Sequence, residues 1–104
     1  MKVYICSPLR GDIEANIKKA QQYCRLAIKE NHFPIAPHIY FTQFLDDNDP
    51  SERKLGMKYA KDLLYECDAL WVCGDKISEG MAEEIAIAKE QGIIIETRRI
   101  PVTY

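Results

Sequence analysis

The sequence has no long apolar run, and this absence excludes whole classes of protein. None of its apolar stretches approaches the roughly 20 residues that a transmembrane helix requires. The first residues lead directly into a short apolar run at 3–6, without the longer apolar region and small-residue cleavage site of a signal peptide. We therefore expect a cytoplasmic protein with no membrane partner.

Paired cysteines are also missing. Four cysteines are scattered along the chain and form no C-x-x-C pair: Cys6, Cys24, Cys67 and Cys73. Their positions inside expected helices and strands favour buried, reduced thiols over a disulfide or a zinc site. The two histidines are not placed as a pair of metal ligands either, because His32 falls at a helix end. We expect no metal.

An excess of one charge is absent, as are the common nucleotide-binding signatures. The formal net charge of −2 gives no electrostatic footprint for a nucleic acid polymer or an anionic membrane. The G-x-G-x-x-G, Walker A and G-x-S-x-G patterns do not occur, so dinucleotide, P-loop and serine-hydrolase chemistry lose support. We expect a protein that works without a cofactor.

The sequence does have the composition of a soluble globular domain. Its 104 residues are 47% hydrophobic and 29% charged, which suits one domain, residues 1–104, with a real core. Strands are predicted at four apolar runs: 3–6, 33–37, 69–73 and 93–95. Two prolines place the second run at an edge of the sheet. The tail, 98–104, is a candidate for an irregular fifth strand.

Helical periodicities lie between these runs. Helices are predicted from Asp12 to Asn31, from Asp49 to about Glu66, and from about Glu79 to Gln91. The apolar face of the second helix is expected to carry six residues: Leu55, Tyr59, Ala60, Leu63, Leu64 and Cys67. The segment between His38 and Asp49 is read as a long binding loop or lid, with aromatic residues Tyr40, Phe41 and Phe44.

This order of elements predicts an α/β fold. We expect a doubly wound, mainly parallel sheet of four or five strands, in the flavodoxin-like order 2-1-3-4(-5), with helices on both faces. Ligands of such sheets bind at the carboxyl ends of the strands. In this order the first and third strands are neighbours, so residues 7–11 should lie beside residues 74–80.

The loop and helix after the third strand supply the main candidate. At about 100° per helical residue, Glu84 lies at the edge of the apolar stripe and is expected to turn toward the sheet, whereas Glu83 lies on the opposite edge. Gly80 would let a ligand approach the backbone closely. The alternative for Glu84 is a first-turn glutamate favoured by the helix dipole.

Other candidates also have ordinary structural alternatives. Asp62 is a second carboxylate, or else a surface residue paired with Lys58 one turn earlier. Tyr4 could reach a carboxylate over the strand tips, or bond to a carbonyl in the core. His38 is a ligand contact or a structural loop histidine. An anion-binding rim is possible from four residues, although a surface ion pair is the alternative for Arg10: Ser7, Arg10, Gly11 and Ser78.

Taken together and in order, several short segments resemble the nucleoside 2-deoxyribosyltransferase-like superfamily. The similarity is greatest to its small bacterial and phage members of unknown function, which are related to the nucleoside 5′-monophosphate N-glycosidases. The segments cover nearly the whole chain: YICSPLRG at 4–11, PIAPH at 34–38, CDALWV at 67–72, and SEG at 78–80 with Glu84 and Ala88.

The resemblance implies an enzyme that cleaves or exchanges the N-glycosidic bond of a (deoxy)nucleoside or its 5′-monophosphate, as a hydrolase or a transferase in nucleotide metabolism. Glu84, six residues after Ser78, matches the nucleophile that forms a glutamyl-glycosyl intermediate. Asp62 matches the acid, and Tyr4 the tyrosine that holds the nucleophile. The phosphate-gripping residues are matched by Ser7, Arg10, Gly11 and Ser78. A serine at 78, where transferases of free nucleosides more often have aspartate, favours a 5′-monophosphate.

Two further expectations follow from the resemblance, and one alternative remains open. Family members usually build each pocket with a neighbouring subunit, so we expect a homo-oligomer, a dimer or larger, in which Tyr104 reaches a neighbour's pocket. The alternative is a nucleotide-binding regulatory or sensing module without turnover. A phosphoacceptor receiver-like domain is disfavoured, because Ser7 and Pro8 stand where its acidic pair would follow the first strand.

Overall fold

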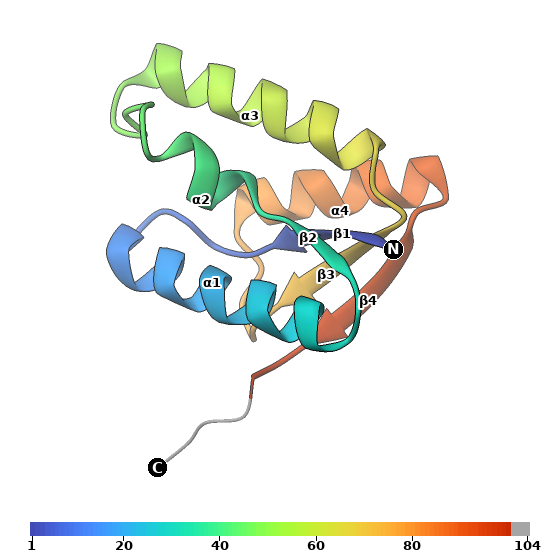
Figure 1. Ribbon diagram of the computed structural model, residues 1–104. Coiled ribbons are helices and arrows are strands. Elements are labelled where there is room, and N and C mark those ends of the chain that lie inside the picture. Colours follow the sequence, from blue (N-terminus) through green and yellow to red (C-terminus); the bar gives the residue numbers. More distant parts are fainter. Residues whose placement is uncertain (101–104) are drawn as a thin grey trace.

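The computed structural model describes residues 1–100, in which one or two helices connect each strand to the next (Figure 1). The strands are β1 (Lys2–Cys6), β2 (Phe33–Ile35), β3 (Ala69–Cys73) and β4 (Ile94–Arg98). The helices are α1 (Ile13–Lys29), α2 (Pro37–Phe41), α3 (Pro50–Tyr65) and α4 (Glu79–Gln91). Within this range no helix is both long and apolar enough to cross a membrane.

The strands form one parallel sheet in the order β2-β1-β3-β4, which confirms the predicted topology. Cys6 at the end of β1 lies opposite Val72 near the end of β3. The loops that follow these two strands therefore leave the sheet side by side. The edge position of β2 is also confirmed, as expected from its proline.

Helices cover both faces of the sheet, and side chains of the central strands alternate between them. Val3 and Ile5 of β1 pack with Tyr23 and Ala27 of α1. Tyr4 and Cys6 belong to the opposite layer, whose helical members come from α3 and α4: Leu64, Met81 and Ala88. Figure 1 shows α3 outermost on this second face, with α2 lying between α1 and α3.

Side-chain caps begin the three long helices where the sequence predicted them. Asp12 accepts a hydrogen bond from Ala15 N at 3.1 Å at the start of α1. Asp49 accepts one from Ser51 N at 3.0 Å before Pro50 opens α3. Such caps satisfy backbone N–H groups that the helix itself leaves without partners. Asn31 has a φ of +63°, which ends the turn after α1 as expected.

The structure corrects three expectations about the elements. The segment read as a loop after the second strand begins with a short helix, α2, because Pro37 at its first turn has the φ that a helix needs. Strand β4 extends to Arg98, beyond the expected end at 95, since an edge strand tolerates polar residues such as Glu96. On α3, Leu55 and Tyr59 are about half exposed rather than turned into the core.

The expected fifth strand is not formed by residues 99 and 100, which follow β4 without strand structure. The remainder of that expectation falls on residues 101–104. These residues, with Tyr104 and its expected contact with a neighbour's pocket, lie outside the described part of the chain.

Candidate active site

A cavity of about 230 Å³ opens at the carboxyl ends of β1 and β3. Its wall comes from the loop after β1, from α2 and the loop behind it, from the inner face of α3, and from the first turns of α4. The residues of this wall include Ser7, Arg10, His38, Asp47, Arg53, Ala60, Lys61, Ser78, Gly80 and Glu84. The cavity is smaller than the roughly 300–1,000 Å³ typical of ligand pockets.

Glu84 is the buried carboxylate of this cavity, with 7% of its surface exposed. It lies on the inward face of α4 with Met81 and Ala88, whereas Glu83 is exposed, so the expected orientation of the two glutamates is confirmed. Burial, with a smaller contribution from the charge of Glu83, raises the pKa of Glu84 from 4.5 to about 7. Tyr4 and Lys61 oppose this rise, since both favour the ionised carboxylate.

Tyr4 reaches Glu84 from β1, below the cavity floor. The ring is fully buried, and burial together with the Glu84 carboxylate holds the pKa of Tyr4 well above its ordinary value. The contact lowers the pKa of Glu84, although its geometry is looser than that of an ideal hydrogen bond. Across residues 1–100, neither Tyr4 Oη nor Glu84 Oε2 has a hydrogen-bond partner. One carboxylate oxygen of Glu84 is thus buried without a hydrogen-bond partner within the described residues.

Ser78 and Gly80 form the first turn of α4 at the cavity wall. Ser78 Oγ accepts a hydrogen bond from Met81 N at 3.2 Å, so this hydroxyl already serves as the helix cap. Gly80 has open space around it, because a Cβ added there would meet no atom within 4 Å. Packing does not require a glycine at this position. The opening is therefore available to a ligand that approaches the backbone.

Ser7, from the loop after β1, and His38, from α2, also line the cavity. Ser7 is 3% exposed, and its hydroxyl has no hydrogen-bond partner within the described chain. Burial lowers the pKa of His38, against the opposing effects of the Ser7 backbone and the Asp47 carboxylate. A neutral imidazole at pH 7 can accept or donate a hydrogen bond. His38 was predicted to lie at the tip of the second strand, but it lies in α2.

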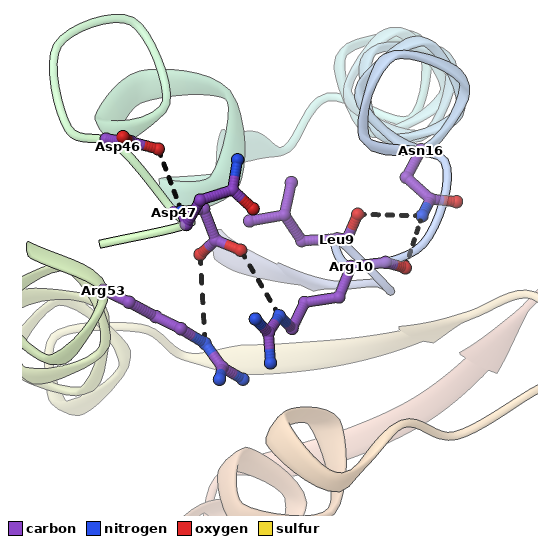
Figure 2. Close-up of polar contacts among 7 residues, drawn as sticks. Leu9, Arg10, Asn16, Asp46, Asp47 and Arg53 are labelled. Atoms are coloured by element: carbon purple, nitrogen blue, oxygen red, sulfur yellow. Dashed lines mark hydrogen bonds and ion pairs between the residues drawn. The ribbon is translucent and has the colours of Figure 1, made fainter. Parts of the chain in front are cut away.

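The loop after β1 is fixed by α1, as Figure 2 shows. Asn16 Nδ2 donates hydrogen bonds to Leu9 O at 2.9 Å and to Arg10 O at 3.1 Å. Gly11 follows with a φ of +99°, a conformation that favours glycine. Gly11 is absent from the cavity wall, whereas Arg10 belongs to it. Gly11 therefore has a backbone role here.

Of the three residues predicted to be catalytic, Asp62 is the one that the fold of the chain does not bring to this cavity. Its side chain is exposed and it does not line the cavity, whose wall on α3 includes Met57, Ala60 and Lys61. Two residues along a helix correspond to a rotation of about 200°, so Asp62 turns away when Ala60 turns inward. Within this chain, Asp62 and Glu84 therefore lie on different surfaces.

Three charged residues of the cavity were not singled out from the sequence: Asp47, Arg53 and Lys61. Lys61 Nζ lies 3.3 Å from Glu83 Oε2, which ties α3 to α4 beside Glu84. Asp47 lies between Arg10 and Arg53. The spacing of Arg53, Met57 and Ala60 along one face of α3 was the sequence signal that could have shown which side of this helix lines the cavity.

In the described chain, no group of three or more His, Cys, Asp or Glu residues could hold a metal ion.

Comparisons with known proteins agree with this architecture. Residues 1–98 match the model of a family described as a domain of unknown function, DUF7768. A solved structure of a 2-deoxyribosyltransferase from the psychrotolerant bacterium Bacillus psychrosaccharolyticus is similar, with a TM-score of 0.69. The likeness covers 99% of this chain and 77% of that chain at 16% identity, so it shows the fold alone. None of the curated proteins compared with the chain matches it.

Proposed function

The chain belongs to the DUF7768 domain family, and from the cavity around Glu84 we propose that it cleaves or exchanges the N-glycosidic bond of a (deoxy)nucleoside or nucleoside 5′-monophosphate. One observation supports this most: a buried carboxylate, Glu84, lies at the wall of the cavity at the strand ends, beside the Tyr4 hydroxyl. A carboxylate in such a position suits nucleophilic attack on a sugar carbon.

The proposed reaction has two steps. Glu84 attacks the anomeric carbon, an ester bond forms, and the bond to the base breaks with its electron pair leaving on the base nitrogen. Water then attacks the same carbon and gives a proton to the group that protonated the departing base, which releases the sugar and restores Glu84; a second base in place of water gives transfer. The attacking form is the carboxylate anion, which Tyr4 and Lys61 favour because both lower the pKa of Glu84.

The departing base needs a proton, and the resemblance assigns this role to Asp62. Because Asp62 is exposed and outside its own protomer's cavity, the assignment requires a site completed by a second subunit. We therefore retain the homo-oligomer as part of the proposal. In such an assembly, Glu84 of one subunit and Asp62 of another would act on one substrate.

A second candidate function is a nucleotide-binding module without turnover. It is favoured by one observation. The inner face of α3 presents Ala60 and Lys61 to the cavity, where protonation of a departing base would need a carboxylic acid. Such a module would bind the same ligands and leave the glycosidic bond intact.

One experiment separates these two functions. The protein is incubated with the common deoxynucleosides and their 5′-monophosphates, with and without a free base, and base release is followed by chromatography. Glu84→Gln is run beside Glu90→Gln, which alters an exposed glutamate of the same helix. We expect base release that Glu84→Gln abolishes and Glu90→Gln preserves. Binding by calorimetry with no base released from any substrate would support the module instead.

A further inference from the structure

The ammonium group of Lys61 lies beside two consecutive glutamates of α4. Lys61 lines the cavity from α3, and α3 packs against α4 on one face of the sheet (Figure 1). Lys61 Nζ is 3.3 Å from Glu83 Oε2, and within residues 1–100 Glu83 provides the only carboxylate within 4.0 Å of this atom. The next residue, Glu84, is buried, and the charge of Lys61 acts on it from a greater distance. One cation therefore influences two carboxylates but contacts only the exposed one.

The contact between Lys61 and Glu83 is poorly explained as a device for stability. The two side chains are 37% and 47% exposed, and an ion pair this open to water adds little to the stability of a fold. Both residues nevertheless belong to the cavity wall, together with the buried carboxylate of Glu84. A role in the chemistry of that carboxylate is the better explanation of the pair.

The other groups that face Glu84 carry no charge at neutral pH. Tyr4 and Cys6 approach it from β1, and burial holds the pKa of each well above its ordinary value. The cavity wall also carries six other charged or titratable residues, none of which is among the groups that shift the pKa of Glu84: Arg10, His38, Asp47, Glu52, Arg53 and Glu79. Within the described chain, Lys61 and Glu83 are thus the charged groups that act on Glu84.

The charges around Glu84 change during the proposed reaction, and a paired lysine suits this change. Glu84 attacks as an anion, which a neighbouring ammonium group favours. The sugar carbon then becomes positively charged in an oxocarbenium-like transition state, and Glu84 is neutral once the ester bond has formed. An ammonium group without a partner would repel the cationic sugar. Lys61 paired with Glu83 repels it less, because the two charges balance.

We propose that Lys61 and Glu83 are positioning residues for Glu84. Lys61 keeps a larger fraction of the nucleophile ionised, and Glu83 holds the ammonium group away from Glu84 and balances its charge while the sugar carbon is cationic. Neither residue touches the reacting atoms in this role. The part that concerns the cationic sugar rests on the proposed function, whereas the effect on the ionisation of Glu84 does not.

Nuclear magnetic resonance can follow the ionisation of Glu84 without any substrate. The full chain is labelled with ¹³C at the side-chain carboxyl of glutamate, and the Glu84 signal is identified by its loss in Glu84→Gln. Lys61→Met should move the titration of Glu84 to a pH about 0.5–1 unit higher, and Glu83→Gln should move it lower by a similar amount. Lys61→Arg keeps the positive charge and should stay close to the wild type. Lys54→Met and Glu90→Gln, exposed residues of the same two helices, are the matched controls and should cause no shift.

Base release gives a second measurement, which a purely structural role would not alter. The pH of half-maximal base release should shift in the same direction as the titration in each variant. In Glu83→Gln, kcat at the optimum pH should fall about tenfold although more of Glu84 is ionised, because the ammonium group without its partner opposes the cationic transition state.

The outcomes distinguish this inference from the proposed function. Opposite shifts of the Glu84 titration in Lys61→Met and Glu83→Gln support the inference, even if no base is ever released. A shift in the same direction in both variants, or no shift, in proteins that still melt cooperatively, overturns it. An unchanged kcat in Glu83→Gln would overturn the charge-balancing role of Glu83 and leave the glycosidic reaction standing.

Discussion

The buried Glu84 carboxyl should make the protein less stable as the pH rises, and Glu84→Gln should remove this effect. The pKa of Glu84 is raised from 4.5 to about 7 in the folded protein, mainly by burial. A group with a raised folded pKa contributes stability below its unfolded pKa and loses that contribution as the pH rises through the folded value. The window therefore lies between about pH 4.5 and pH 7.

The size of the effect follows from this window. It spans roughly 2.5 pH units at about 1.4 kcal/mol each, so the free energy of unfolding should fall by up to ~3 kcal/mol from this group. A glutamine keeps the shape of the protonated side chain and does not ionise. The stability of Glu84→Gln relative to the wild type should therefore increase by that amount between pH 4 and pH 8.

Urea unfolding followed by circular dichroism at a series of pH values measures this difference. Glu90→Gln is the control, because it changes an exposed carboxylate on the same helix and should run parallel to the wild type. A constant offset between Glu84→Gln and the wild type over the whole pH range would refute the reasoning. It would mean that the carboxyl is solvated, or that its charge is compensated, in the folded protein.

Three other changes have expected outcomes. Tyr4→Phe removes a contact that lowers the pKa of Glu84. The rising limb of the pH profile of base release should therefore shift to a pH about one unit higher. If the limb stays at the same pH, Tyr4 does not act on the carboxylate. Gly80→Val fills open space at the cavity wall, so it should weaken calorimetric ligand binding at least tenfold, with the melting temperature nearly unchanged; unaltered binding would place the ligand elsewhere. Asp62→Asn and Glu84→Gln should each stop base release, and a mixture of the two variants after subunit exchange should regain part of it; no recovery would argue against a shared site.

Much of the fold could be predicted because its signals are local. The run at 69–73 is apolar at every position and ends at Gly74, so β3 was found with its exact bounds. Capping residues indicated the starts of α1 and α3 in the same way, with Asp12 and Asp49 preceding them. The inward direction of Glu84 followed from the position of that residue relative to the apolar residues of one helical face.

The parts that the sequence missed depend on contacts between distant segments. Helix α2 is five residues long, too short for a helical period to appear. The half-exposed Leu55 and Tyr59 gave α3 apolar residues on more than one side, so its inner face was misjudged. Arg10 and Asp47, which are far apart in the sequence, meet only because the loop between α2 and α3 lies beside the loop after β1, and no local pattern encodes that contact.

The central claim, a covalent bond between Glu84 and a sugar carbon, can be tested by mass spectrometry of the protein quenched in acid during turnover. The substrates are the deoxynucleoside 5′-monophosphates. The account predicts a fraction of the protein with the added mass of one deoxyribose phosphate, carried by the peptide that contains Glu84 and absent from Glu84→Gln. Steady base release by the wild type with no such adduct, or equal release by Glu84→Gln, would contradict it.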